Sequence, residues 1–431
     1  MKAEVPMKAI STATALALLL FTQGCRRSHP VAANPAPSRA CLVTTAAGSR
    51  GDSEIAKFQE DLREHRAPAR AAEQLGYRFI SKARLTNDAG FYTVAEQAAA
   101  CLESIQPADP AALLLRGHVL HQMHRFREAE AIARRLVTLR EFVLDFGLLG
   151  DTLMEQGRLG EAADAYQKMM DLKPFYQSYV RAAHLRWLKG DLDGAIELMT
   201  SAVKAASPRD PESVAWAYVR LATYQLQRGQ FAEAERMIAS SLQYVPDYAT
   251  ALLVRGRIQL AQHKPVEAVA SLERAARLNP LPEYNWTLAD ALRSAHRIDD
   301  AIAVERMVIA DAADPRTVAL YLSTRQTNVK KAVDLARAEL EKRGDVFTLD
   351  ALAWALARAG HMNEASAVMA RALAEGTQDG RLFLHAAAIA AASGRHADAA
   401  RWASKARTFR FTLLPSELGV LRSGIVSRPR V

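Results

Sequence analysis

The chain has 431 residues, of which half are hydrophobic and only 7% aromatic, with 21 Gly and 17 Pro. This length exceeds what one core usually serves, so we expect several domains or an array of repeats, and the Ala- and Leu-rich composition favours helices over sheets. The formal net charge is +9, with Lys and Arg scattered along the chain, which disfavours a nucleic-acid partner.

Residues 1–24 have the features of a secretory signal peptide. Lys2 and Lys8 precede an apolar run from Ala9 to Phe21. About 13 residues are too few to span a bilayer, which needs about 20, but they suit a signal-peptide core. Met7 is an equally good start site. We therefore expect the protein to be exported.

The apolar run ends at Thr22, Gln23, Gly24 and Cys25. Gly24 and Cys25 resemble the end of a bacterial lipobox, whereas Thr22 and Gln23 depart from its usual residues. The resemblance implies that Cys25 is acylated and becomes the mature N-terminus; cleavage by the ordinary signal peptidase is the alternative. Arg26 stands where a signal for retention at the inner membrane usually has Asp. We expect an anchor in the outer membrane, facing the periplasm.

Two short segments precede the main body of the chain. Residues 25–52 contain several Pro, Ala and Ser, which is typical of a flexible tether. Residues 53–66 have Ile55, Phe58 and Leu62 at helical spacing, and so predict a short N-terminal helix.

The main body repeats one pattern ten times, at intervals of about 34 residues. Each copy has an Ala at the same place: Ala95, Ala129, Ala162, Ala195, Ala234, Ala268, Ala301, Ala332, Ala365 and Ala399. Twelve positions earlier stands Gly or Ala in every copy but one, which has Leu320. Five positions earlier six copies have Gly, including Gly90, where a turn between helices is expected. One interval is longer, at residues 207–211, which we interpret as an insertion between repeats.

This pattern resembles the tetratricopeptide-repeat (TPR) family over residues 67–411. The resemblance implies an all-α fold, an α-solenoid of about ten helix-turn-helix repeats in a right-handed superhelix. Residues 412–431 are then expected to form a tail that covers the last repeat, because terminal repeats expose an apolar face.

In that family the first helix of each repeat lines a concave groove, where a partner binds. Counting from the small residue of each copy, the resemblance assigns to the groove His118, His121, Gln122, Asp151, Glu155, His184, Trp187, Arg257, Trp286, Asp290, Arg293, Tyr321, Arg325, Trp354 and Arg358. Aromatic and Arg side chains suit a protein or peptide partner, and the four Arg of the later repeats favour an acidic segment. Two alternatives stay open: the three Trp could pack between helices, and the Arg could be ordinary solvated surface.

Other chemistry has weaker support. His118, His121 and His124 form H-x-x-H-x-x-H, but this spacing spreads the rings around a helix and disfavours a shared metal ion. The sequence has no recognisable catalytic or cofactor motif, so we expect neither an enzyme nor a cofactor. Cys41 and Cys101 could form a disulfide in an oxidising compartment.

Together these features predict a membrane-anchored interaction scaffold or assembly factor of the bacterial cell envelope. The alternative is an envelope protein that binds a metal or small ligand through its His-rich first repeats.

Overall fold

A computed structural model describes residues 52–86, 88–310 and 314–423. The predicted signal peptide, Cys25 and the tether lie outside these residues. In the described part there are 22 α-helices, one short 3-10 helix and no strand. The helices are α1 (Asp52–Arg63), α2 (Pro68–Thr86), α3 (Gly90–Ile105), α4 (Pro110–Gln122), α5 (Phe126–Leu139), α6 (Val143–Glu155), α7 (Leu159–Leu172), α8 (Tyr176–Leu188), α9 (Leu192–Ala205), α10 (Pro211–Gln227), α11 (Phe231–Tyr244), α12 (Ala249–Ala261), α13 (Pro265–Leu278), α14 (Pro282–Ser294), α15 (Ile298–Ala310), α16 (Pro315–Arg325), α17 (Val329–Lys342), α18 (Val346–Arg358), α19 (Met362–Leu373), α20 (Gly380–Ala392), α21 (His396–Thr408), the 3-10 helix η2 (Arg410–Thr412) and α22 (Pro415–Ser423).

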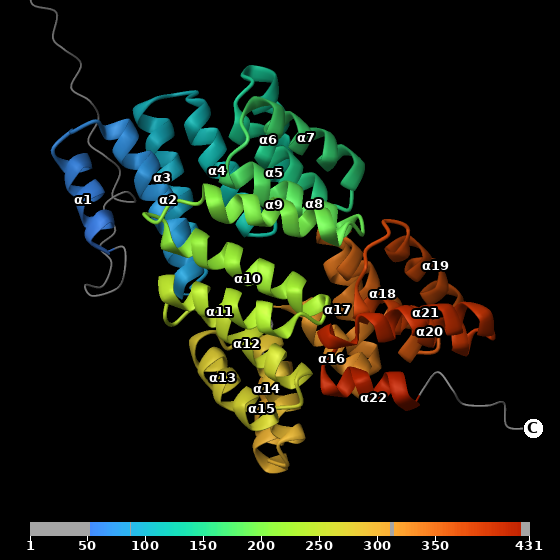
Figure 1. Cartoon of the computed structure of the whole chain (residues 1–431). Coiled ribbons are helices and arrows are strands. Elements are labelled where there is room, and N and C mark those ends of the chain that lie inside the picture. Colours follow the sequence, from blue (N-terminus) through green and yellow to red (C-terminus); the bar gives the residue numbers. More distant parts are fainter. Residues whose placement is uncertain (1–51, 87, 311–313, 424–431) are drawn as a thin grey trace, which may run out of the picture. The chain divides into compact units, whose positions relative to one another are not determined.

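Consecutive helices from α2 to α21 pack as ten pairs, beginning with α2 on α3 and ending with α20 on α21 (Figure 1). The second helix of a pair packs on the first helix of the next pair, and the first helices of neighbouring pairs also touch. This arrangement confirms the predicted all-α solenoid of about ten repeats.

The repeated Ala residues allow the helices to pack closely. All ten, from Ala95 to Ala399, are at most 3% exposed, because each lies where its second helix meets the neighbouring helices. Three of the small residues on the first helices are Gly117, Gly150 and Gly256, and a methyl group there would overlap a neighbouring Leu or Tyr side chain. The spacing of small residues is thus a requirement of close helix packing.

The turns within the pairs need a left-handed backbone. Five of the six predicted turn glycines, those at 157, 190, 229, 360 and 394, have φ between +73° and +86°. The sixth prediction was wrong: Gly90 is the first residue of α3, which begins earlier relative to its anchor than other second helices do. His124, His263 and His296 occupy the equivalent position with φ near +60°, a region in which His is more common than most residues.

The predicted insertion at residues 207–211 is only partly a loop. Helix α9 ends at Ala205 and α10 begins at Pro211, with Asp210 accepting a hydrogen bond from the backbone of Ser213. Helix α10 has 17 residues, compared with 13 for most other first helices. The extra residues therefore lengthen this helix, and they place Glu212 at its start.

The last described segment crosses several repeats. We call residues 409–423 the C-terminal strap; it contains η2 and α22. It packs on the first helices α10, α12, α14, α16 and α20, and buries Leu413, Leu414 and Leu421. It therefore does more than cover the final repeat. None of the described helices is both long enough and apolar enough to cross a membrane.

Candidate partner-binding surface

The fifteen predicted groove residues all lie on first helices, from α4 to α18. None of them is exposed. Five are buried: Trp187, Trp286, Asp290, Tyr321 and Trp354. The other ten are partly accessible. The three Trp side chains are 8%, 1% and 1% exposed, so in this conformation they pack within the protein.

Asp151 is the centre of a polar cluster on α6, α7 and α8. Its two carboxylate oxygens accept hydrogen bonds from Arg181, at 2.8 and 2.6 Å, and one of them also accepts from the Tyr166 hydroxyl at 2.8 Å. Burial alone would raise the pKa of Asp151, but Arg181 outweighs it and holds the pKa below its usual value. Asp151 is therefore an ionised carboxylate that the chain itself neutralises.

Two histidines beside this cluster are held neutral. Burial lowers the pKa of His118 to about 3, and Arg181 adds to the effect. Burial and Arg220 likewise lower the pKa of His184 to about 3. Both imidazoles therefore remain uncharged at neutral pH, and they can act only as neutral hydrogen-bonding or stacking groups.

The three histidines of the H-x-x-H-x-x-H pattern do not point to one common site, and each packs against an aromatic side chain. His118 packs edge-on against Tyr77, with ring centroids 6.2 Å apart, while His121 and His124 pack against Phe126 at 5.3 and 5.5 Å. Within the described ranges, no group of three or more His, Cys, Asp or Glu is arranged to hold a metal ion. The histidines of the first repeats thus contribute to packing.

Sequence reasoning missed Arg220 of α10. Its guanidinium lies over the rings of Trp187, Trp216 and Tyr224, at 5.2 to 5.9 Å from their centroids, and 3.1 Å from His184 Nδ1. Arg181 and Arg220 both stand two positions before the small residue of their copies. The recurrence of Arg at this position could have indicated a role for Arg220, but the position was not among those assigned to the groove.

Most of the Arg residues expected to attract an acidic partner are already paired. Arg293 binds Glu305 at 2.7 Å, and Arg325 binds Asp290 at 3.0 Å. Arg257 lies 3.3 Å from Glu283. Arg358 instead stacks on Trp354, 4.2 Å from the ring centroid. The positive charge of this row is therefore largely balanced within the chain.

The C-terminal repeats cover part of the predicted groove, beginning with the connection between α17 and α18. Arg343 forms an ion pair with Glu155 of α6 at 2.6 Å, and the Gly344 amide donates to the Glu155 carbonyl at 3.1 Å. Phe347 stacks on Trp187 of α8, with ring centroids 5.6 Å apart. The connection and the first turn of α18 therefore contact two of the predicted groove residues, Glu155 and Trp187.

The connection between α19 and α20 makes the next contact. The Thr377 hydroxyl donates to the Leu188 carbonyl at the end of α8 at 2.5 Å, and Lys189 pairs with Glu375 at 2.6 Å. Gln227 of α10 donates to the Gln378 carbonyl, and it also accepts from the Trp187 indole at 2.8 Å. This connection therefore contacts the end of α8 and the following first helix, α10.

The strap makes the third contact. Phe411 packs edge-on against Phe231 of α11 at 4.9 Å, and the Ser416 amide donates to Asp290 of α14 at 2.8 Å. Burial raises the pKa of Asp290 to about 6, although Ser416 and Arg325 oppose this shift. The array therefore folds back on itself, so that successive late connections lie on successive early repeats.

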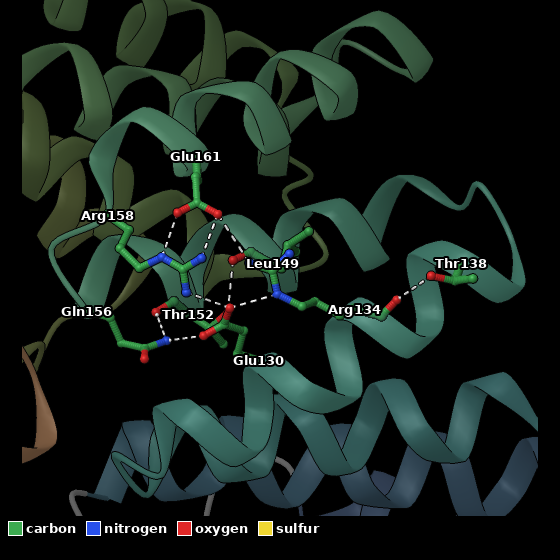
Figure 2. A network of polar contacts seen from close by, with 8 residues as sticks. All are labelled: Glu130, Arg134, Thr138, Leu149, Thr152, Gln156, Arg158 and Glu161. Atoms are coloured by element: carbon green, nitrogen blue, oxygen red, sulfur yellow. Dashed lines mark hydrogen bonds and ion pairs between the residues drawn. The ribbon is translucent and has the colours of Figure 1, made fainter.

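A separate polar network joins α5 to the next helix pair (Figure 2). Glu130 accepts hydrogen bonds from Arg134 at 2.8 Å and Arg158 at 2.7 Å. Gln156 donates to the same carboxylate at 2.7 Å. Burial would raise the pKa of Glu130, but these hydrogen bonds lower it. Glu161 accepts two hydrogen bonds from Arg158. We assign this network to the packing between neighbouring repeats.

Comparison with known proteins identifies the repeat unit. The family model described as tetratricopeptide repeat matches residues 148–211, 219–281 and 256–315. Among solved structures, the human IFIT1 dimer with PPP-AAAA is 15% identical, over 71% of this chain and 72% of that chain, with a TM-score of 0.48. MamA is 18% identical, over 38% of this chain and 93% of that chain, with a TM-score of 0.32. No curated protein matches this chain.

Proposed function

Since this chain is a tetratricopeptide-repeat protein, we propose that it is a lipid-anchored scaffold or assembly factor of the bacterial cell envelope that binds another protein and catalyses nothing itself. The stack of ten helix pairs carries this proposal. Stacked repeats offer a long surface of side chains from successive helices, which suits an extended partner. The repeats also take up most of the described chain and leave no separate catalytic domain.

Export is supported by the leader and by one cysteine. Cys101 is disulfide-bonded, and disulfides persist in oxidising compartments such as the periplasm. The other two cysteines lie outside the described residues. We propose that Cys41 is the partner of Cys101, because Cys25 is the residue that the lipobox would acylate.

The proposed partner is a protein rather than a nucleic acid. Arg84, Arg181 and Arg325 all pair with carboxylates of the chain itself, namely Glu212, Asp151 and Asp290. Guanidinium groups already neutralised in this way contribute little to phosphate binding. The predicted groove residues that remain partly accessible are His, Gln, Asp, Glu and Arg, a polar set in which both signs of charge occur, as at the rim of protein interfaces.

The anchor can be tested by metabolic labelling. The full chain, produced in a Gram-negative host fed with an alkyne-bearing palmitate, is expected to carry the label and to sediment with the envelope. Cys25→Ser should lose the label and release the protein into the soluble fraction, while Cys41→Ser should keep both the label and the anchor. A labelled Cys25→Ser protein would contradict the proposal.

The scaffold role can be tested in the native envelope. Chemical cross-linking followed by purification is expected to yield a defined partner protein. We expect Arg358→Glu, on a first helix, to reduce its recovery at least tenfold, while the matched charge reversal Arg306→Glu, on the exposed side of α15, leaves it unchanged. Recovery of no specific protein, or equal loss in both variants, would count against the proposed role.

A further inference from the structure

A cavity of about 290 Å³ lies between the C-terminal strap and the helices α12 to α14. Leu260 at the end of α12 and Pro265 at the start of α13 form one side, while Phe411, Leu413 and Leu418 of the strap form the other. Most of the lining is therefore apolar. None of the fifteen predicted groove residues contributes to it, although Leu260, Ala261 and Ser294 lie at the ends of the first helices α12 and α14.

The strap side of the cavity is fixed by contacts of the strap with several helices. Leu413 is buried, and Phe411 is held by its edge-on contact with Phe231. The strap itself is secured by the Ser416 hydrogen bond to Asp290 and by the ion pair of Glu417 with Arg381. The cavity is thus preformed, which reduces the entropic cost of filling it.

The polar part of the lining is positively charged. Arg410 and Arg422 line the cavity together with His263 and Ser294, and no Asp or Glu does. Within the described chain neither guanidinium forms an ion pair; Arg410 donates to the Arg407 carbonyl at 3.1 Å and stacks on Phe411 at 4.2 Å. This contrasts with the first-helix surface, where Arg257, Arg293 and Arg325 are paired with nearby carboxylates.

We infer that this cavity binds an acidic segment of a partner protein, with one large apolar side chain inserted between α12 and the strap and carboxylates facing Arg410 and Arg422. The volume is at the lower limit of the roughly 300–1,000 Å³ of small-molecule sites, so it suits one or two side chains. Two unpaired guanidinium groups beside an apolar hollow provide both an anchor point and charge complementarity. This inference rests on the proposed function, because it specifies the kind of segment that the proposed protein partner would present.

The chain's own C-terminal residues are a poorer match. Residues 424–431 contain Arg428 and Arg430 and no acidic residue, so they would bring positive charge to Arg410 and Arg422. Like charges at short range are unfavourable. The charge of the cavity therefore selects an external acidic segment over this tail.

The test uses the full mature chain and a fluorescein-labelled peptide in which a central Phe is flanked by four Glu, measured by fluorescence anisotropy. We expect saturable binding that is at least tenfold weaker for a peptide with Ala in place of Phe, and undetectable for one with Lys in place of Glu. The variant Arg410→Glu with Arg422→Glu should weaken binding at least tenfold. Ala261→Trp, which fills the cavity, should do the same. Arg371→Glu, an exposed charge reversal on α19, is the matched control.

The outcomes separate this inference from the proposed function. Equal binding of the Glu and Lys peptides, or no effect of the cavity variants, would overturn the inference even if a partner is still recovered from the envelope. Binding of oleate at this cavity without peptide binding would also overturn it, in favour of a fatty-acid ligand. Melting temperatures of all variants within a few degrees of the parent chain would exclude misfolding as the cause.

Discussion

At three of the small-residue positions, glycine is required because a methyl group has no room. A Cβ added at Gly256 would overlap the Leu272 side chain, whereas a Cβ added at Gly160 of α7 would have no other atom within 4 Å. We expect Gly256→Ala to destabilise the protein by about 1–3 kcal/mol through overpacking. Gly160→Ala should be neutral or stabilising by up to about 1 kcal/mol, since Ala is the better helix former.

Urea denaturation followed by circular dichroism would measure both variants. The urea midpoint is expected to fall for Gly256→Ala and to stay or rise for Gly160→Ala. Equal midpoints for the two variants would show that the small residue is not needed for helix contact.

Stability should depend on pH through the two neutral histidines. The pKa of His118 and of His184 is about 3 in the folded chain, but about 6.5 when unfolded. Between pH 3 and pH 6.5 the unfolded chain therefore binds more protons than the folded chain does. The free energy of unfolding is thus highest above pH 6.5, and it decreases as the pH falls below that value. The loss can reach about 1.4 kcal/mol per histidine per pH unit.

We expect the doubly substituted chain, His118→Gln with His184→Gln, to lose less stability between pH 7 and pH 5 than the parent chain does. Substitution of the exposed His396 by Gln serves as the control. If the double variant and the parent had the same pH dependence in urea titrations, the two imidazoles would not be held neutral in the folded chain.

At the scale of elements, four of the ten second helices have a charged pair at the same place, near their start. Arg125 with Glu128, Arg158 with Glu161, Arg297 with Asp300 and Arg395 with Asp398 stand at the same two positions of their copies. The acidic residue lies in the first helical turn, where negative charge is favourable. These pairs are exposed, so each contributes little to stability. These pairs are a recurring feature of the repeat sequence, but they contribute little to the stability of the fold.

The helices and their pairing could be predicted because the signals for them are local. The Ala at each anchor, the small residue before it and the turn glycine all act within one repeat. The prediction of a turn at Gly90 failed because α3 begins at that residue, earlier relative to its anchor than the other second helices do. The cover over the first-helix surface could not be predicted in this way: Phe347 and Trp187 are far apart in sequence, and nothing periodic relates them.

The same reason limited the prediction of the site. Position within the repeat placed all fifteen residues on first helices, but it could not show that Asp290 meets Ser416 or that Glu155 meets Arg343. The cavity at the strap was missed altogether, because residues 412–431 were expected only to cover the last repeat. Contacts between distant repeats depend on how the rotations of many repeats add up.

The contact between Phe347 and Trp187 predicts coupled local stability. Aromatic pairs contribute about 0.5–1.5 kcal/mol beyond their burial. We expect Phe347→Ala to speed amide hydrogen exchange both around residues 343–350 and at the end of α8, which are far apart in the chain. Phe142→Ala, at an exposed ring, should change neither segment. Faster exchange near residue 347 alone would mean that the two segments are independent.

At the scale of the whole molecule, closure changes what the repeats can offer a partner. The early repeats present first-helix side chains that the late connections partly cover, so the accessible surface is smaller than in an open array. The strap, in contrast, adds a cavity with unpaired positive charge. A partner would therefore meet a largely preformed surface, with the ordering entropy already spent in folding.

Zero-length carbodiimide cross-linking tests this closure most directly, because it joins a Lys to a carboxylate only when the two are in contact. Lys189 and Glu375 form an ion pair at 2.6 Å, and both side chains are accessible. Mass spectrometry of the treated chain is expected to find an amide bond between them that disappears in Glu375→Gln. If this link is absent although exposed carboxylates elsewhere in the chain are modified by the carbodiimide, the late repeats do not lie on the early ones and the first-helix surface is open.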